Sequence, residues 1–139
     1  MVALETYSTN VTVAENTPIP LNNVALSKGC EIEKQGSATI QFNKCGAYRV
    51  NVNCVATASE AGNLGIQLQK DGVLQPQAVS GITATETTSL RPMSFETFVQ
   101  VSRNNSNCCC VSPVTISIIN TGVEAIFDNI DVTISKEPC

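Results

Sequence analysis

Histidine and tryptophan are both absent from this chain of 139 residues. The first absence removes the side chain that most often serves as a general base or metal ligand near neutral pH. The second removes the best aromatic platform for a sugar ring. The eight lysine and arginine residues are scattered and the formal net charge is −4, whereas binders of nucleic acids and anionic membranes carry clustered basic residues. The composition therefore predicts no enzyme, no cofactor and no nucleic-acid partner.

Long hydrophobic runs are missing as well. No apolar stretch approaches the length of about 18 residues that a transmembrane helix needs. The first ten residues, MVALETYSTN, have neither the basic start nor the hydrophobic stretch of a signal peptide. If Met1 is the native start, these absences predict a protein that is made and assembled in a cytoplasm and has no membrane partner.

Valine, isoleucine and threonine are abundant, and no segment keeps the 3.6-residue period of an amphipathic helix. The stretch from Ala38 to Cys54 reads as a strand, a tight turn and a second strand, which we interpret as a hairpin. Its apolar residues share one parity and are predicted to face a core: Ile40, Phe42, Tyr48, Val50, Val52 and Cys54. The chain is therefore predicted to be all-β.

Similar alternation recurs along the rest of the chain. A second hairpin is predicted at Lys70-Asp71-Gly72, which follows the strand from Leu64 to Gln69. About eight to ten short antiparallel strands predict a jelly-roll β-sandwich. The length corresponds to a single domain, residues 1–139. Because proline is excluded from central strands, Pro18 and Pro20 mark residues 1–20 as an edge strand and its connection, and residues 21–139 as the core sandwich.

Two phenylalanines lie on the wrong parity for the core. Phe98 alternates with Thr97 and Val99, and Phe127 lies opposite in parity to Ile130. Both rings are therefore predicted to point outward. An apolar ring on the outer face of a sandwich favours a subunit interface over a stray exposed residue.

Three motifs together resemble the tumour-necrosis-factor and complement globular-head superfamily, in its compact bacterial or phage form. They are Phe42…Gly46-x-Tyr48, Leu68-x-Lys70-Asp71-Gly72 and Ala125-Ile126-Phe127-x-x-Ile130. The resemblance implies a TNF-like jelly roll that assembles as a homotrimer, often as the head of a fibre. It also implies that Tyr48 lies near the threefold axis, although its parity places it in the core. The closing motif departs from complement heads, because Asp128-Asn129 stands where they carry a glycine.

The thiols are unusual in number and arrangement. The odd count and the run of Cys108, Cys109 and Cys110 favour reduced thiols over an intrachain disulfide framework. Bridges between chains stay open for this run and for Cys139, and a metal held by one cysteine from each of three subunits is a minor alternative. The run lacks the spacing of a zinc site, so no metal is predicted. The seven cysteines are Cys30, Cys45, Cys54, Cys108, Cys109, Cys110 and Cys139.

Two polar segments are candidate ligand sites. Glu124, Asp128, Asn129 and Asp131 offer oxygen ligands for calcium but lack the spacing of a dedicated loop, which favours a solvated outer face. The tract Arg103-Asn104-Asn105-Ser106-Asn107 is predicted to be a loop, and its amides suit sugar hydroxyls. Arg103, Asn104, Asn105 and Asn107 are therefore candidate glycan contacts.

These observations favour a non-enzymatic structural protein. The leading hypothesis is a homotrimer on the surface of a phage virion, as capsid decoration, head fibre or tail-fibre tip, assembled in the host cytoplasm and bound to a capsid or fibre protein. A bacterial spore-surface or cell-surface protein of the same fold is the first alternative. An adhesin that binds host-surface glycans is the second, and an enzyme that depends on a carboxylate such as Glu96 is the last.

Overall fold

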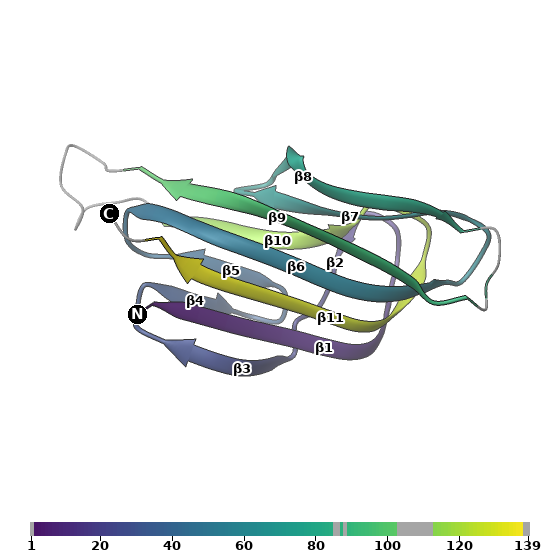
Figure 1. Cartoon of the computed structure of the whole chain (residues 1–139), viewed down its shortest axis with the longest axis horizontal. Helices are drawn as coiled ribbons and strands as arrows, with labels where there is room; N and C mark the ends of the chain where they lie inside the picture. Colours follow the sequence, from purple (N-terminus) through teal and green to yellow (C-terminus); the bar gives the residue numbers. More distant parts are fainter. Residues whose placement is uncertain (1, 85–86, 88, 103–112, 138–139) are drawn as a thin grey trace.

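The computed structural model describes residues 2–84, 87, 89–102 and 113–137. In this part of the chain two antiparallel sheets face each other, as the predicted jelly-roll β-sandwich requires (Figure 1). No helix of the described part is long and apolar enough to cross a membrane. Sheet A has the strand order β3-β1-β11-β6-β9, and its strands are β1 (Ala3–Val13), β3 (Asn23–Lys28), β6 (Gly46–Ala58), β9 (Arg91–Val101) and β11 (Ala125–Lys136). Sheet B has the order β4-β5-β10-β7-β8 with β2 paired to β10, and its strands are β2 (Thr17–Pro18), β4 (Ile32–Gln35), β5 (Thr39–Phe42), β7 (Gly62–Lys70), β8 (Val73–Ala84) and β10 (Val114–Asn120).

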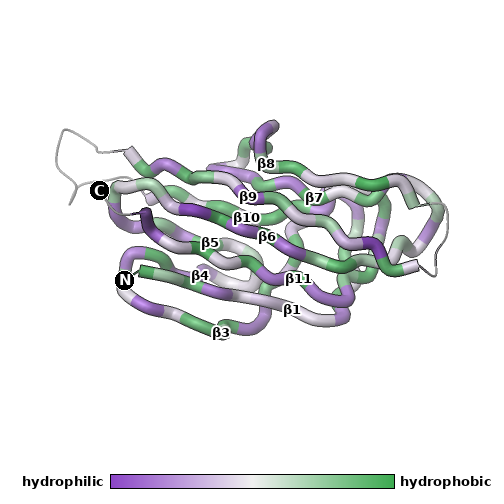
Figure 2. The backbone as a smooth tube through the Cα atoms, in the orientation of Figure 1, coloured by the Kyte–Doolittle hydropathy of each residue, from purple (hydrophilic) through white to green (hydrophobic). Residues whose placement is uncertain are grey.

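The core lies between the two sheets and is made by the inward residues of each strand. Strand β6 shows the principle, because Tyr48, Val50, Val52 and Cys54 are buried while Arg49 and the other residues of opposite parity are not. The same alternation of hydrophobic and hydrophilic residues is visible along most strands (Figure 2). The predicted inward parity of this stretch is therefore confirmed.

The pairing predicted for this stretch is wrong. Strand β5 pairs with β4 and β10 in sheet B, whereas β6 pairs with β11 and β9 in sheet A. Residues 43–45 thus cross from one sheet to the other. The rings of Phe42 and Tyr48 still meet inside the sandwich, with centroids 4.6 Å apart and planes inclined by 48°. The alternation of apolar and polar residues shows which side of a strand is buried. The same alternation is found whether two successive strands form a hairpin or belong to different sheets.

The second predicted hairpin is confirmed. Strands β7 and β8 are antiparallel neighbours, and the residues between them have positive φ, 49° at Asp71 and 85° at Gly72. Two central residues with positive φ are what a type I′ turn requires, and this turn matches the twist of the strands that it joins.

The first strand differs from its expected role as an edge. β1 begins at Ala3 and lies between β3 and β11, so residues 1–20 contain an inner strand. Two of its buried inward residues are polar, Thr6 and Ser8. The Ser8 hydroxyl is satisfied because it accepts a hydrogen bond from the Asn22 backbone N–H at 2.7 Å. Polar inward residues conceal the alternation that would have identified this strand.

Strand β11 contains a bulge that reverses its parity. Phe127 is opposite Ala56 and Asn129 is opposite Val55, so Asp128 is an extra residue relative to β6. Phe127 is consequently 0% exposed and belongs to the core. The prediction that Phe127 points outward is wrong, because the bulge shifts the alternation by one residue between Phe127 and Ile130.

Asn120 fastens one end of the sandwich. Its buried Nδ2 atom donates to the carbonyl oxygens of Val13 at 3.0 Å, Ala14 at 3.3 Å and Val123 at 3.1 Å. Its Oδ1 atom accepts from the Gly122 N–H at 3.1 Å. One amide therefore joins the end of β1 in sheet A to the end of β10 in sheet B and to the loop before β11.

Candidate functional site

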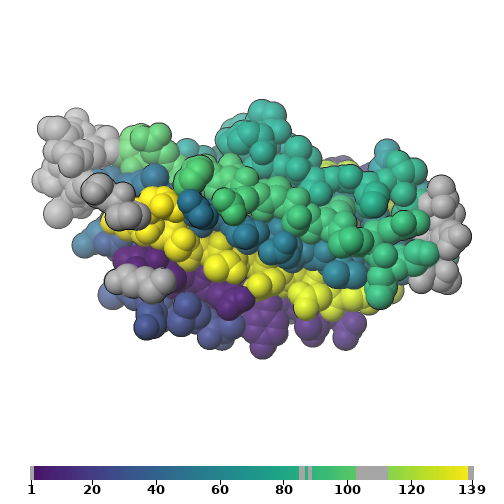
Figure 3. Space-filling view, viewed as in Figure 1, coloured from purple at the N-terminus to yellow at the C-terminus, as the bar shows by residue number. Residues whose placement is uncertain are grey.

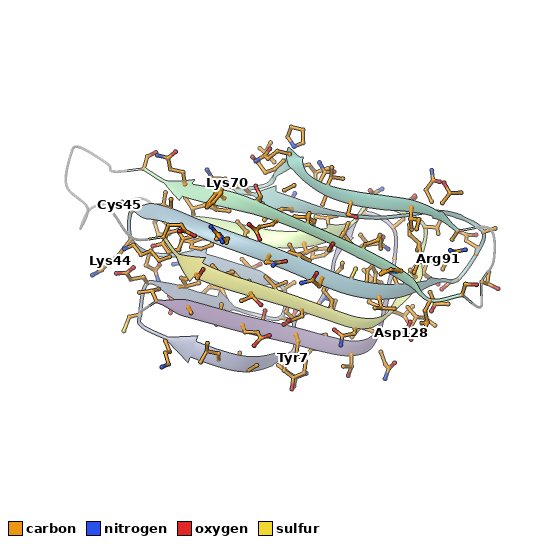
Figure 4. The ribbon with its side chains drawn as sticks, viewed as in Figure 1. Tyr7, Lys44, Cys45, Lys70, Arg91 and Asp128 are labelled. Carbon is orange, nitrogen blue, oxygen red and sulfur yellow. The ribbon has the colours of Figure 1, made fainter. Side chains whose placement is uncertain are left out.

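A groove lies on the outer face of sheet A. It has a volume of about 740 Å³, and residues from all five strands of the sheet line it. This face is turned toward the reader in Figure 3, where β11 crosses the molecule in yellow between β1 and β6. Tyr7 projects from β1 on this side (Figure 4). The walls combine apolar groups such as Val55 and Pro92 with the polar side chains of Asn53, Ser94 and Asn129.

Two carboxyl groups lie together in this groove. Asp131 on β11 is paired in register with Tyr7 on β1, and Glu5 is two residues before Tyr7 on the same side of the strand. Burial raises the pKa of Asp131 to about 6, and a hydrogen bond to Glu5 and the negative charge of Glu5 act in the same direction. Its Oδ1 atom is buried and has no hydrogen-bond partner among the described residues.

Phe98 lies on the same face, on β9, and its outward orientation confirms the parity prediction. The ring is 54% exposed. The Arg49 guanidinium lies over it, 5.4 Å from the ring centroid. Arg49 is held there by Glu137, with Nε to Oε1 at 2.9 Å, and more weakly by Glu96 at 3.7 Å. Aromatic rings and arginines of this kind are the side chains most enriched in protein interfaces.

Strand β8 presents a second apolar surface. It is the outer strand of sheet B and packs against β9, the outer strand of sheet A. Val73 is 63% exposed, and Leu74 and Val79 are also exposed. Leu90, just before β9, is exposed as well. We refer to β8 with Leu90 as the apolar edge.

Tyr48, which the family resemblance placed near a threefold axis, is instead part of the core. Its side chain is 0% exposed within one chain. The hydroxyl donates to the Lys44 carbonyl oxygen at 2.8 Å, and Lys136 Nζ lies 5.9 Å from the ring centroid. Burial, and then the charge of Glu31, raise the pKa of Tyr48 to about 12. Neither Tyr48 nor Phe127 reaches the surface of the single chain, whereas Phe98, the third residue predicted at the interface, is exposed.

The thiols are in three different situations. Cys54 is buried and free, and burial raises its pKa to about 12. Cys30 is exposed and free. Cys45 is disulfide-bonded, which contradicts the expectation of reduced thiols at this position. Four predicted thiols, Cys108, Cys109, Cys110 and Cys139, and the candidate glycan contacts Arg103, Asn104, Asn105 and Asn107 lie outside the described residues.

The carboxylates considered for calcium are dispersed. Asp128 accepts a hydrogen bond from Thr57 Oγ1 at 2.8 Å at the β11 bulge (Figure 4), while Asp131 faces Glu5 in the groove. Among the described residues, no three cysteine or carboxylate side chains are grouped so that they could hold a metal ion. Sequence reasoning did not single out Glu5, Tyr7 or Asn53. The available signal was their outward parity, which becomes informative only when the sheet order is known.

No protein-family model matches this chain. No curated protein matches its sequence. Among solved structures, the Eiger TNF from S. frugiperda is similar with a TM-score of 0.69 and 10% identity, over 100% of this chain and 98% of that one. Murine APRIL has a TM-score of 0.67 and 8% identity, over 98% of both chains. The PRD1 vertex protein P5 has a TM-score of 0.60 and 16% identity, over 99% of this chain and 97% of that one. Identities this low establish the fold alone, which is the TNF-like jelly roll.

Proposed function

We propose that this chain is a non-enzymatic structural module, a homotrimeric jelly roll on the surface of a phage virion. In this role it is a capsid decoration, a head fibre or a tail-fibre tip that is assembled in the host cytoplasm, is bound to a capsid or fibre protein and aids attachment. Support comes from the full-length similarity in fold to the PRD1 vertex protein. The absence of histidine supports a role without acid–base chemistry.

The main support for the proposed trimer is that one chain has two unlike surfaces. The groove of sheet A is concave and is lined by Tyr7, Val55 and Pro92. The apolar edge exposes Val73 and Val79 on β8, a strand of sheet B that packs against β9. Two different surfaces that meet between identical copies form a head-to-tail contact, which closes into a ring when the rotation between copies allows it. In the proposed trimer, the apolar edge of each copy covers the groove of the next, and Phe98 is buried at the margin of this contact.

The test is the native mass in solution. Size-exclusion chromatography with light scattering is carried out on the wild type and on Phe98→Asp, with and without reductant. We expect a trimer that survives reduction, and monomers for Phe98→Asp, because the substitution removes the apolar ring from the interface and places a charged carboxylate there. Gln35→Asp adds the same charge at an exposed position of β4 in sheet B and should remain trimeric. A wild type that is monomeric at every concentration would contradict the proposal.

The location on a virion has its own test. The protein should be detected by mass spectrometry in purified particles, and its gene should lie beside capsid or portal genes. Sporulation genes in the same neighbourhood would support the spore-surface alternative. Binding to a glycan array that is lost in Asn104→Ala/Asn105→Ala would support the adhesin alternative, whereas a blank array with intact trimers would contradict it.

A further inference from the structure

The groove of sheet A has two acidic side chains and no basic one among the residues that line it. The residues that face the pair from the neighbouring strands are uncharged. On β6, Asn53 is opposite Asp131, and on β9, Ser94 is opposite Asn53. On β3, Leu26 is opposite Glu5. The pair therefore has no counterion among the described residues of the groove.

The basic residues of sheet A lie outside the lining of the groove. Lys28 lies two residues beyond Leu26 and is opposite Ala3, and none of the described ion pairs includes it. Arg49 on β6 is engaged by Glu96 and Glu137. The other titratable groups that line the groove are the Tyr7 phenol and the thiol of Cys54, which points to the core. None of the described ion pairs therefore includes Glu5 or Asp131.

We propose that the Glu5–Asp131 pair makes assembly of the trimer depend on pH, with one proton held between the two carboxyl groups at each covered groove. This inference rests on the proposed function, in which the apolar edge of the next copy covers the groove. Covering removes water from both carboxyl groups and strengthens their mutual repulsion. The covered groove therefore binds the shared proton more tightly than the open groove does.

The direction of the effect follows from proton linkage. In the single chain the pKa of Asp131 is about 6, and covering the groove raises it further. Well below pH 6 the open groove already holds the proton, and the pair makes no contribution to the pH dependence of association. As the pH rises above 6, the open groove loses its proton first, so association weakens until the covered groove is also ionised. The slope in this window approaches a tenfold change in the association constant per pH unit at each interface.

Light scattering or sedimentation at constant ionic strength, from pH 5.5 to 8.5, tests this inference. The wild type should be more dissociated at pH 8.5 than at pH 5.5. Asp131→Asn should remove this dependence and associate at pH 8.5 as well as the wild type does at pH 5.5. Glu5→Gln should reduce the dependence, because Asp131 keeps its burial but loses the neighbouring charge. Glu60→Gln removes an exposed carboxylate between β6 and β7 and should retain the wild-type profile.

The two proposals fail in different ways. A wild type that is trimeric with equal affinity across this pH range would overturn the pH dependence and leave the trimer intact. The pH dependence would also be overturned if Asp131→Asn kept the wild-type profile while its circular dichroism spectrum showed a native fold. A wild type that is monomeric at every pH would overturn the trimer itself.

Discussion

Removal of the Asn120 amide should destabilise the sandwich more than its small size suggests. The side chain is 0% exposed. It has two N–H groups directed at three carbonyl oxygens, and one oxygen that accepts from Gly122. Asn120→Ala therefore removes the equivalent of three hydrogen bonds, each with a net contribution of about 1 kcal/mol. It also leaves the Gly122 N–H without its partner.

The expected loss in the free energy of unfolding is about 3 kcal/mol, a large part of the about 5–15 kcal/mol that stabilises a typical domain. The corresponding fall in the melting temperature is about 10 °C for a chain of this length. Urea unfolding followed by far-ultraviolet circular dichroism measures it directly, at one protein concentration for all variants, because assembly also affects stability.

Two further variants make the result interpretable. Asn23→Ala removes an exposed amide from β3 and should change stability by about 0.5 kcal/mol or less. Asn120→Asp places a carboxylate oxygen where an amide nitrogen now faces three carbonyl oxygens, and at pH 7 it should be at least as unstable as the alanine variant. A loss below about 1 kcal/mol for Asn120→Ala, or a stable Asn120→Asp, would refute the assigned network.

Two other predictions concern the titratable groups of the core. In the native protein Cys30 should react with iodoacetamide, and Cys54 should not react until the chain is unfolded, because the pKa of the buried Cys54 thiol is about 12. Peptide mapping by mass spectrometry distinguishes the two thiols. Equal labelling of both would contradict the burial of Cys54. The raised pKa of Tyr48 means that the unfolded chain ionises first, so stability that is present below pH 10 should be lost as the pH rises through 12. Tyr48→Phe should reduce that loss and cost about 1 kcal/mol at neutral pH through the missing bond to Lys44. Urea titrations at several pH values measure both effects.

Alternation is a sufficient guide wherever a strand is regular and its inward residues are apolar. The inward face of β6 and the outward ring of Phe98 follow from parity alone, because successive side chains of an extended chain point to opposite sides. The turn at Asp71 and Gly72 follows from local chemistry, because these residue types tolerate positive φ. Each of these features depends on residues within a few positions of one another.

The errors have three distinct physical origins. Parity carries no information about which sheet a strand joins, so the crossover between β5 and β6 has the same pattern as a hairpin. One extra residue, Asp128, reversed the orientation expected for Phe127. Polar inward residues on β1, Thr6 and Ser8, hid the strand that carries half of the acidic pair. The groove itself joins residues from five strands that are distant in sequence, and no local pattern specifies such an assembly.

The bulge in β11 has a counterpart beside it in β1. Thr9 is paired with Asn129, and Val11 is paired with Phe127. Asn10, with φ of 53°, therefore lies beside the extra residue Asp128. The two insertions keep these neighbours in step with each other, while β6 has no equivalent residue. The lengths of β1 and β11 are therefore coupled although the two residues are far apart in the sequence. Deleting Asn10 or Asp128 alone would turn the side chains of one half of that strand to the opposite face from those of its neighbour. Deleting both residues together would restore a continuous ladder between β1 and β11. A change at one of these positions is therefore expected to require a matching change at the other.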